Sequence, residues 1–310
     1  MTEKIALIGF GEAGRNIGGG LVAEAKTRVS AYDLLAGEKP MADAARVAGV
    51  DLKTAIGPAL EGASVIFSLV TASSAIDAAC AVAKHLKAGQ AYIDFNSVSP
   101  MTKQKVADAV APSGADFVEA AIMAPVPGPG HRVPVLVSGP KAAALAARLN
   151  ALGMRLDLAG ERIGDASLSK MLRSIFIKGI EALLLEGLIA AHRVGLEDRI
   201  LDSVQQTVPG IDWKEAASYY LERTAKHGAR RAAEMHESAA TVAELGLNPV
   251  LTSAIARRIE WAHQQLKDVR WPEGGPKSYQ EVLAAIEAKL LAQGGSKSTA
   301  PRASKVSKAS

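Results

Sequence analysis

"KIALIGFGEAGRNIGG", residues 4–19, carries glycines at positions 9, 11 and 14 between a short apolar run and the start of a helical pattern. In a strand-loop-helix unit, this spacing provides a tight turn at Gly9, a close backbone approach at Gly11 and helix-to-strand packing at Gly14. The first N–H groups of such a helix attract an anion such as a diphosphate. The alternative is a glycine-rich turn without a ligand. We predict a dinucleotide-binding loop that consists of Gly9, Phe10, Gly11, Glu12, Ala13 and Gly14.

Asp33 ends the next predicted strand, residues 29–33, and lies 19 residues after Gly14. A carboxylate at this place can accept hydrogen bonds from both ribose hydroxyls of the cofactor, and it repels a 2′-phosphate. The four residues that follow include no arginine that could hold such a phosphate. We therefore predict NAD as the cofactor, with NADP as the alternative because Arg28 and Lys39 lie nearby in the sequence.

Further short apolar runs, rich in β-branched and aromatic residues, occupy residues 63–70, 91–95 and 115–122. Segments of helical composition separate them, which is typical of buried strands in βα units. A last strand, helix and strand are predicted over residues 135–159. Residues 125–134 contain four prolines and two glycines, so we expect irregular structure there.

Past residue 160 the strand pattern disappears and helical segments follow one another, separated by glycine and proline. The sequence thus predicts an α/β fold, with an N-terminal Rossmann doubly wound parallel sheet and a C-terminal all-α domain linked by a long helix. We expect domains at 1–160 and 161–293, followed by a disordered basic tail at 294–310. The predicted helices of the second domain span 164–194, 197–208, 212–226, 229–245, 249–267 and 278–292.

The net charge of +4 comes from the tail, which holds Lys297, Arg302, Lys305 and Lys308 and no acidic residue. The rest of the chain is neutral, so we predict no nucleic-acid partner and interpret the tail as a solubilising end. Histidines without ligand spacing and a single cysteine, Cys80, indicate neither a metal site nor an intrachain disulfide. No stretch is typical of a secretory signal, and Glu181 and Glu186 interrupt the most apolar run. We therefore expect a cytoplasmic protein without a membrane span.

"GDASLSKMLRSIFIKGIEALLLEGLIAA", residues 164–191, predicts one long apolar helix with Lys170 near its start. A buried ammonium needs water, an anion or the loss of its proton. Lys170 therefore either extends from a domain junction into solvent or serves in a site. Ser174 lies one helical turn further and shares its face.

Polar residues also follow two predicted strands, at the edge where open α/β sheets bind their ligands. Val70 ends the run 63–70, Thr71 and Ser73 follow it, and Asn96 and Ser97 come after 91–95. We expect Val70, Thr71 and Asn96 to line the cofactor. The alternative for Thr71 and Ser73 is a helix cap.

Together, the glycine loop and the lysine at the head of a long helix resemble the β-hydroxyacid dehydrogenases, such as 3-hydroxyisobutyrate and 6-phosphogluconate dehydrogenases. "KMLRSIFIKGIEALLLE" and "HGARRAAEM" resemble more narrowly the 6-phosphogluconate dehydrogenase NAD-binding proteins with their own C-terminal domain. "DFNSVSP" is similar to the substrate motif of the family, with Asp94 and Pro100 matching. "GDASLSKMLRS" is similar to the catalytic motif, with Ala166 in place of a glycine and Ser174 in place of an asparagine. The glycine pair that wraps the substrate carboxylate in the family is essentially absent from "EAAIMAPVPGPG".

The resemblance implies hydride transfer between the nicotinamide and a small hydroxy acid or oxo acid, with Lys170 as the acid/base group and Ser174 beside it. It also implies a homodimer, with a small-molecule substrate that carries a carboxylate. "KHGARRAAEMHES" adds an arginine that could hold this carboxylate, or else a solvated charged helix face. The predicted substrate-binding residues are Asn96, Ser97, Val98, Lys170, Ser174 and Arg231.

Two other functions remain open on the sequence alone. An imine reductase has a similar fold, but those enzymes usually replace the lysine. A non-catalytic protein that binds NAD and interacts with partners would explain the departures at Ala166 and Ser174.

Overall fold

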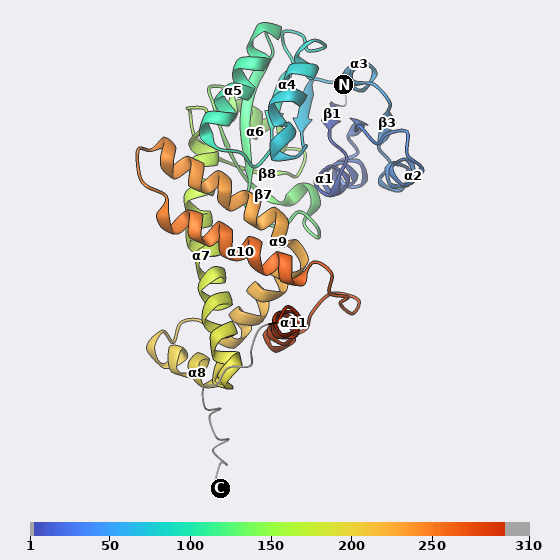
Figure 1. Cartoon of the computed structure of the whole chain (residues 1–310). Helices are drawn as coiled ribbons and strands as arrows, with labels where there is room; N and C mark the ends of the chain where they lie inside the picture. Colours follow the sequence, from blue (N-terminus) through green and yellow to red (C-terminus); the bar gives the residue numbers. More distant parts are fainter. Residues whose placement is uncertain (1–2, 295–310) are drawn as a thin grey trace. The chain divides into compact units, whose positions relative to one another are not determined.

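The computed structural model describes residues 3–294 (Figure 1). The chain divides into two compact units, Met1–Leu172 and Arg173–Ser310. The boundary lies inside a helix and 12 residues after the expected one at position 160, because the first turns of that helix pack with the sheet-containing unit. Of the expected tail, residues 295–310 lie outside the described part of the chain.

The first unit contains an eight-stranded sheet with the order β3-β2-β1-β4-β5-β6-β7-β8. Pairing is parallel from β3 to β6, β7 is antiparallel to β6, and β8 is parallel to β7. The predicted doubly wound sheet is therefore confirmed as mostly parallel. The strands are β1 (Lys4–Ile8), β2 (Arg28–Tyr32), β3 (Asp51–Lys53), β4 (Val65–Ser68), β5 (Ala91–Asp94), β6 (Asp116–Ile122), β7 (Pro134–Ser138) and β8 (Arg155–Gly160).

Two features of the sheet differ from the expectation. The short, half-exposed strand β3 was not predicted, because three residues carry too little pattern. β7 is reversed because only 11 residues, including the short 3-10 helix Gly130–Arg132, connect it to β6. A parallel crossover normally needs a dozen or more residues and a full helix.

Helices cover both faces of the sheet, since successive residues of a buried strand point to opposite sides. Ile5 and Leu7 of β1 pack in one core with α1, α2 and α6, whereas Ala6 and Ile8 pack in a second core with α3, α4 and α5. These helices are α1 (Glu12–Ala23), α2 (Lys39–Ala48), α3 (Ile56–Leu60), α4 (Ala75–Ala83), α5 (Pro100–Val110) and α6 (Ala142–Asn150); η1 (Ala72–Ser74) and η2 (Ala111–Ser113) are 3-10 helices.

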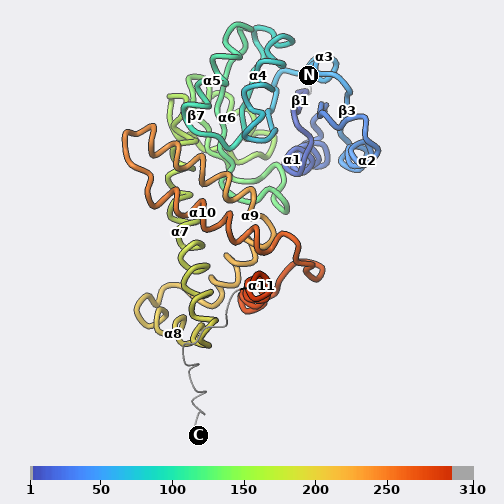
Figure 2. The backbone as a smooth tube through the Cα atoms, viewed as in Figure 1, coloured from blue at the N-terminus to red at the C-terminus, as the bar shows by residue number. Residues whose placement is uncertain are grey.

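The second unit is helical, and Figure 2 traces its backbone from α7 onwards. The predicted segments 212–226 and 229–245 form one helix, α9, with non-helical backbone angles at His227. At the next residue, Gly228, a Cβ would lie 2.8 Å from Cβ of His263, so a close approach to α10 requires glycine there. The helices are α7 (Asp165–Val194), which runs through the boundary, α8 (Glu197–Thr207), α9 (Trp213–Glu244), α10 (Val250–Leu266) and α11 (Tyr279–Ala292).

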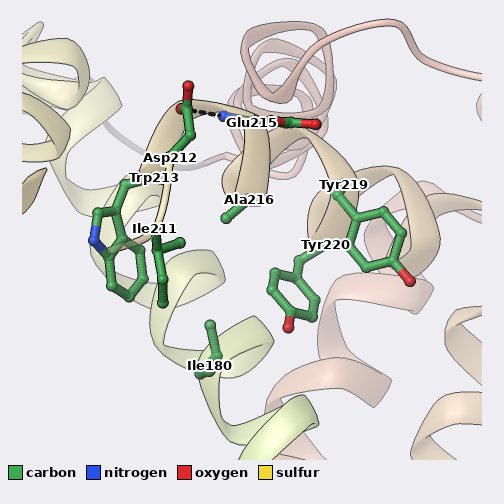
Figure 3. A pocket seen from close by; sticks show the side chains of 8 residues that line it. All are labelled: Ile180, Ile211, Asp212, Trp213, Glu215, Ala216, Tyr219 and Tyr220. Atoms are coloured by element: carbon green, nitrogen blue, oxygen red, sulfur yellow. Dashed lines mark hydrogen bonds between the residues drawn. The ribbon is translucent and has the colours of Figure 1, made fainter. Parts of the chain in front are cut away.

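A cavity of about 310 Å³ lies in the second unit, beside the start of α9 (Figure 3). Its lining includes Ile180 of α7 and the aromatic side chains of Trp213, Tyr219 and Tyr220. None of the predicted site residues lines it. Within residues 3–294, no helix is long and apolar enough to cross a membrane.

Candidate active site

The glycine loop connects β1 to α1 in a geometry that requires glycine at two positions. Gly9 has φ of +95°, and a Cβ on it would lie 2.4 Å from the carbonyl oxygen of Leu69. A Cβ on Gly14 would lie 2.5 Å from the carbonyl oxygen of Gly9. These two glycines therefore let the loop press against β4 and let α1 press against the loop.

Gly11 has the opposite surroundings, because a Cβ on it would meet no atom within 4 Å. Gly11 is the N-cap of α1 and directly precedes the first N–H groups of the helix, which have no partner within the helix. Glu12 is exposed and Ala13 is half-buried. No side chain at position 11 would therefore hinder an anion such as a diphosphate from approaching this helix N-terminus.

Asp33 is bound directly to the glycine loop. One carboxylate oxygen accepts a hydrogen bond from the backbone N–H of Phe10 at 2.7 Å, and the other accepts from the N–H of Leu35 at 2.9 Å. Each oxygen keeps a second lone pair for a ribose hydroxyl. Sequence reasoning missed Arg15, whose guanidinium donates to the carbonyl oxygen of Phe10 at 3.1 Å.

The hydroxyls after β4 form a small surface cluster. The Thr71 hydroxyl lies 3.1 Å from that of Ser73 and 2.9 Å from that of Ser74. Thr71 precedes the 3-10 helix η1 without a side-chain capping hydrogen bond, so the alternative of a helix cap is wrong for Thr71. Val70 is half-buried, and its Cγ1 lies 3.1 Å from the position of a Cβ on Gly9.

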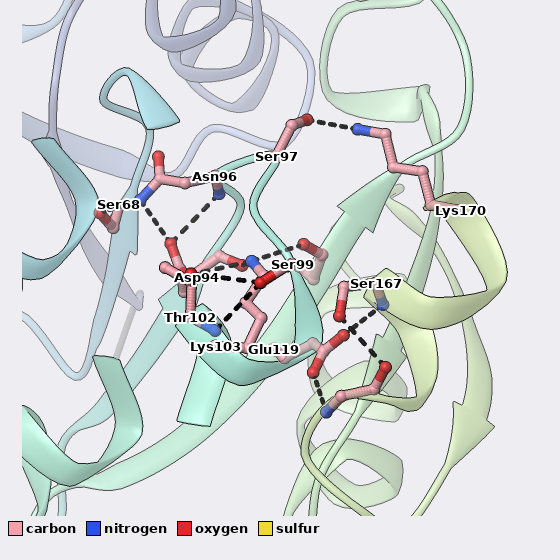
Figure 4. Close-up of polar contacts among 12 residues, drawn as sticks. Ser68, Asp94, Asn96, Ser97, Ser99, Thr102, Lys103, Glu119, Ser167 and Lys170 are labelled. Atoms are coloured by element: carbon pink, nitrogen blue, oxygen red, sulfur yellow. Dashed lines mark hydrogen bonds and ion pairs between the residues drawn. The ribbon is translucent and has the colours of Figure 1, made fainter. Parts of the chain in front are cut away.

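Asn96 is 3% exposed and is held at the end of β5 by three hydrogen bonds (Figure 4). Its side-chain NH₂ donates to Asp94 Oδ1 at 2.5 Å and to the Ser68 hydroxyl at 2.9 Å, and its backbone N–H also donates to Asp94 Oδ1. Lys103 donates to Asp94 Oδ2 at 3.0 Å in a buried ion pair. Among residues 3–294, the side-chain oxygen of Asn96 is buried without a hydrogen-bond partner. Asn96 can therefore act toward a ligand only as an acceptor.

Lys170 contacts Ser97, the residue that directly follows Asn96. Its ammonium donates to the hydroxyl of Ser97 at 2.5 Å, and both residues are half-buried (Figure 4). Because an ammonium can only donate, Ser97 is the acceptor and its own proton is available to another group. Val98 was expected to bind substrate, but its side chain is 1% exposed and packs in the core. The expected side-chain contact of Val98 with substrate is therefore corrected.

The start of α7 is fixed by groups that the sequence did not single out. The buried carboxylate of Glu119 in β6 accepts hydrogen bonds from the backbone N–H groups of Gly164 and Ser167. The Ser138 hydroxyl accepts from the N–H of Ala166 at 3.1 Å. A carboxylate satisfies the orphan donors of a helix N-terminus and complements its dipole. The available signal was a charged residue in the middle of the apolar run "FVEAAI", residues 117–122.

Ser174 and Arg231 belong to the second unit. Ser174 accepts a hydrogen bond from the ammonium of Lys178 at 3.3 Å. Arg231 is 5% exposed, and its Nε and Nη2 donate to the buried carboxylate of Glu181. The fork expected to hold a substrate carboxylate is thus occupied by a carboxylate of the chain itself.

Two family models match the chain. Residues 4–155 match the NAD binding domain of 6-phosphogluconate dehydrogenase, and residues 191–262 match a domain of unknown function, DUF1932. A conserved hypothetical protein from Sinorhizobium meliloti 1021 is 42% identical, with 94% of this chain and 97% of that chain covered and a TM-score of 0.75. The conserved protein MTH1747, described as structurally similar to 3-hydroxyacid dehydrogenases, is 32% identical over 84% of this chain and 97% of its own, with a TM-score of 0.69.

A more distant structure, the 3-hydroxyisobutyrate dehydrogenase of Mycobacterium tuberculosis, shares the fold. It is 17% identical, 93% of this chain and 99% of that chain are covered, and the TM-score is 0.71. The fold and the glycine loop define an NAD(P)-binding protein. The chain belongs to the 6-phosphogluconate dehydrogenase-like family in which this domain precedes the DUF1932 domain. The predicted resemblance and the NAD(P) cofactor are confirmed.

Proposed function

We propose that the protein is an NAD-dependent oxidoreductase that transfers hydride between the nicotinamide and a small hydroxy acid or its oxo acid. The observation that carries this proposal is the 2.5 Å hydrogen bond between Lys170 and Ser97, in the same compact unit as the glycine loop. The bound nicotinamide would accept or supply the hydride. Binding the substrate and transferring its proton would then be the task of the protein's own side chains.

Lys170 would act as the general acid/base. In oxidation a basic amine takes the hydroxyl proton of the substrate as hydride leaves its carbon, and in reduction the ammonium returns a proton to the carbonyl oxygen. Ser97 fixes the place of the Lys170 nitrogen by accepting its hydrogen bond. The presence of this lysine also favours a dehydrogenase over an imine reductase.

Asn96 supports a ligand that brings a hydroxyl donor. Both of its N–H donors are committed to Asp94 and Ser68, so its free oxygen suits a hydroxyl and would repel a carboxylate. A hydroxyl of the substrate or of the cofactor ribose meets this requirement. The carboxylate of a hydroxy acid needs donors elsewhere in the site.

The unobstructed helix N-terminus at Gly11 and the carboxylate of Asp33 support NAD as the bound cofactor. Asp33 offers two acceptor oxygens to the ribose hydroxyls and repels a 2′-phosphate. Leu34 and Leu35, which follow it, are 88% and 57% exposed and offer no positive charge.

A homodimer is part of the same proposal, and the second unit would supply the contact. Phe176 and Leu183 of α7 are 75% and 74% exposed, and Ile200 of α8 is 44% exposed. Apolar side chains of this size rarely stay in water when they gather on one face. Sedimentation analysis of the wild type and of Leu183→Glu tests this, with a monomeric wild type as the contrary outcome.

Lys170→Ala tests the catalytic assignment. Turnover of a panel that includes 3-hydroxyisobutyrate, glycerate and serine should fall more than a hundredfold, while NAD affinity by calorimetry stays within threefold of wild type. Lys84→Ala, at an exposed lysine after α4, serves as the control and should change neither. A wild type that binds NAD and oxidises nothing in the panel would instead favour the non-catalytic NAD-binding protein.

A further inference from the structure

Lys103 is a fully buried lysine of the first unit that the proposed chemistry does not use. Its ammonium donates to the carbonyl oxygen of Asp94 at 2.7 Å, to Oδ2 of Asp94 at 3.0 Å and to the carbonyl oxygen of Ala120 at 3.3 Å. The other carboxylate oxygen of Asp94 accepts from the backbone N–H and the side-chain NH₂ of Asn96, at 3.1 and 2.5 Å. Asp94 thus connects the buried ammonium to the amide of Asn96 (Figure 4).

Stability alone gives no reason for this ion pair. Apolar side chains of similar volume often stabilise a protein core as well as a buried ion pair does, because desolvation costs much of the attraction between the charges. A buried charged group can instead serve to select one arrangement of its neighbours. The neighbour in this case is Asn96, whose amide has two orientations that exchange its oxygen and its NH₂.

The carboxylate of Asp94 permits only one of these orientations. In the ion pair with Lys103 it only accepts hydrogen bonds, so it pairs with an NH₂ group and repels an amide oxygen. The second neighbour of the amide, the hydroxyl of Ser68, pairs with either group because a hydroxyl both donates and accepts. Asp94 therefore selects the orientation of Asn96, and Lys103 compensates the charge that makes the selection.

The selected orientation leaves the amide oxygen of Asn96 without a donor. Asn96 is 3% exposed, and within residues 3–294 its side-chain oxygen has no hydrogen-bond partner. Figure 4 shows this oxygen turned away from Ser68 and Asp94. A buried acceptor without a donor costs free energy, which a ligand hydroxyl or a buried water would recover. A ligand group that only accepts, such as a carboxylate, would recover nothing there.

We propose that Lys103 is a positioning residue that acts through Asp94 and keeps the oxygen of Asn96 directed at a hydroxyl of a bound ligand. Asn96 follows β5 in the parallel part of the sheet, and open α/β sheets bind their ligands beyond the carboxyl ends of the strands. Two ligands can bring this hydroxyl, the nicotinamide ribose of NAD and the hydroxy-acid substrate. The substrate as a source rests on the proposed function, whereas the ribose requires only that the cofactor binds.

Calorimetry of the full chain with NAD and with ADP separates this role from a purely structural one. Asn96→Leu removes the acceptor and should raise the Kd of NAD about tenfold if the hydroxyl is that of the ribose. Asp94→Val/Lys103→Met removes the selecting carboxylate without leaving a charge unpaired, and it should raise the same Kd at least threefold because nothing holds the amide. ADP lacks the nicotinamide half, so its Kd should stay within twofold and shows that the glycine loop is intact.

If the hydroxyl belongs to the substrate, the Kd of NAD should stay within twofold, and the KM of the fastest hydroxy acid of the panel should rise by these factors instead. Adding Asn96→Leu to the charge-balanced variant should be no worse than Asn96→Leu alone, since Lys103 acts through Asn96. Val106→Ala, at a fully buried position of the same helix α5, is the matched control for lost packing and should change neither constant.

The inference is overturned if the charge-balanced variant binds ADP normally and keeps both the Kd of NAD and the KM of the wild type, because an internal water would then satisfy Asn96. Effects that multiply in the triple variant overturn it as well. If the charge-balanced variant does not bind ADP, Asp94→Ala/Lys103→Met replaces it under the same criteria. A wild type that oxidises no hydroxy acid contradicts the proposed function and removes the substrate as a source, and the titrations with NAD then decide the inference alone.

Discussion

The buried ion pair between Lys103 and Asp94 offers the sharpest quantitative test of the first unit. Neither side chain is more than 1% exposed. The Lys103 ammonium donates to Asp94 Oδ2 at 3.0 Å, to the Asp94 carbonyl at 2.7 Å and to the Ala120 carbonyl at 3.3 Å. Lys103→Met keeps most of the side-chain volume and removes all three donors, which leaves the Asp94 carboxylate buried beside Asn96.

The expected loss follows from this geometry. Two unit charges 3.0 Å apart attract by about 5.5 kcal/mol at an effective dielectric constant of about 20. Desolvation offsets part of that attraction in the native protein, and removing one partner of a buried pair typically costs about 3–5 kcal/mol. We therefore expect the free energy of unfolding of the first unit to fall by about 3–5 kcal/mol. Asp94→Asn/Lys103→Met, which removes both charges, should lose less than half of that.

Urea denaturation with two probes can assign the loss to the correct unit. Far-UV circular dichroism follows the whole chain, whereas tryptophan fluorescence reports on the second unit because Trp213, Trp261 and Trp271 all lie there. The variant should shift the dichroism transition and leave the fluorescence transition in place. A loss below about 1 kcal/mol, or a double variant less stable than Lys103→Met, would refute the argument that an unpaired buried charge dominates.

Three further predictions concern the first unit. Burial lowers the pKa of His131 from its ordinary 6.5, so below that pH the unfolded state binds more protons than the folded state. The free energy of unfolding should therefore fall as the pH drops from about 6.5 to 5. Denaturation at each pH should show a less steep fall for His131→Gln. Gly9→Ala would place Cβ 2.4 Å from the Leu69 carbonyl at a positive φ, so NAD affinity should fall more than tenfold by calorimetry, and wild-type affinity would contradict the loop geometry. Asp33→Ser should weaken NAD and admit NADP, and an unchanged preference in parallel titrations would remove Asp33 from the ribose site.

The features predicted best from sequence are those whose chemistry is local. Gly9 and Gly11 lie in the loop and Gly14 in the first turn of α1, and Asp33 follows at the spacing that the βα unit fixes, so pattern and geometry coincide. The break expected near residue 227 appears as a bend in α9, since a glycine there marks a close helix contact whether or not the helix stops.

The features missed depend on contacts between residues far apart in the sequence. Lys103 looks like any other lysine on its helix, and only the position of Asp94 shows that it is buried. Glu119 meets Gly164 across 45 residues, and Glu181 meets Arg231 across 50. No spacing rule links such pairs. The sequence therefore suggested a substrate carboxylate as the partner of Arg231, whereas the structure shows the carboxylate of Glu181 in that place.

The position of Lys170 depends on the register of β6, because Glu119 of this strand holds the start of α7. β6 pairs with β5 on one side and β7 on the other, and the side chain of Glu119 reaches α7 from only one face of the sheet. A single-residue insertion within Asp116–Ile122 would turn that carboxylate to the opposite face and uncap the helix. Natural length variation in relatives of this chain should therefore accumulate in residues 125–129 and avoid the strand before them.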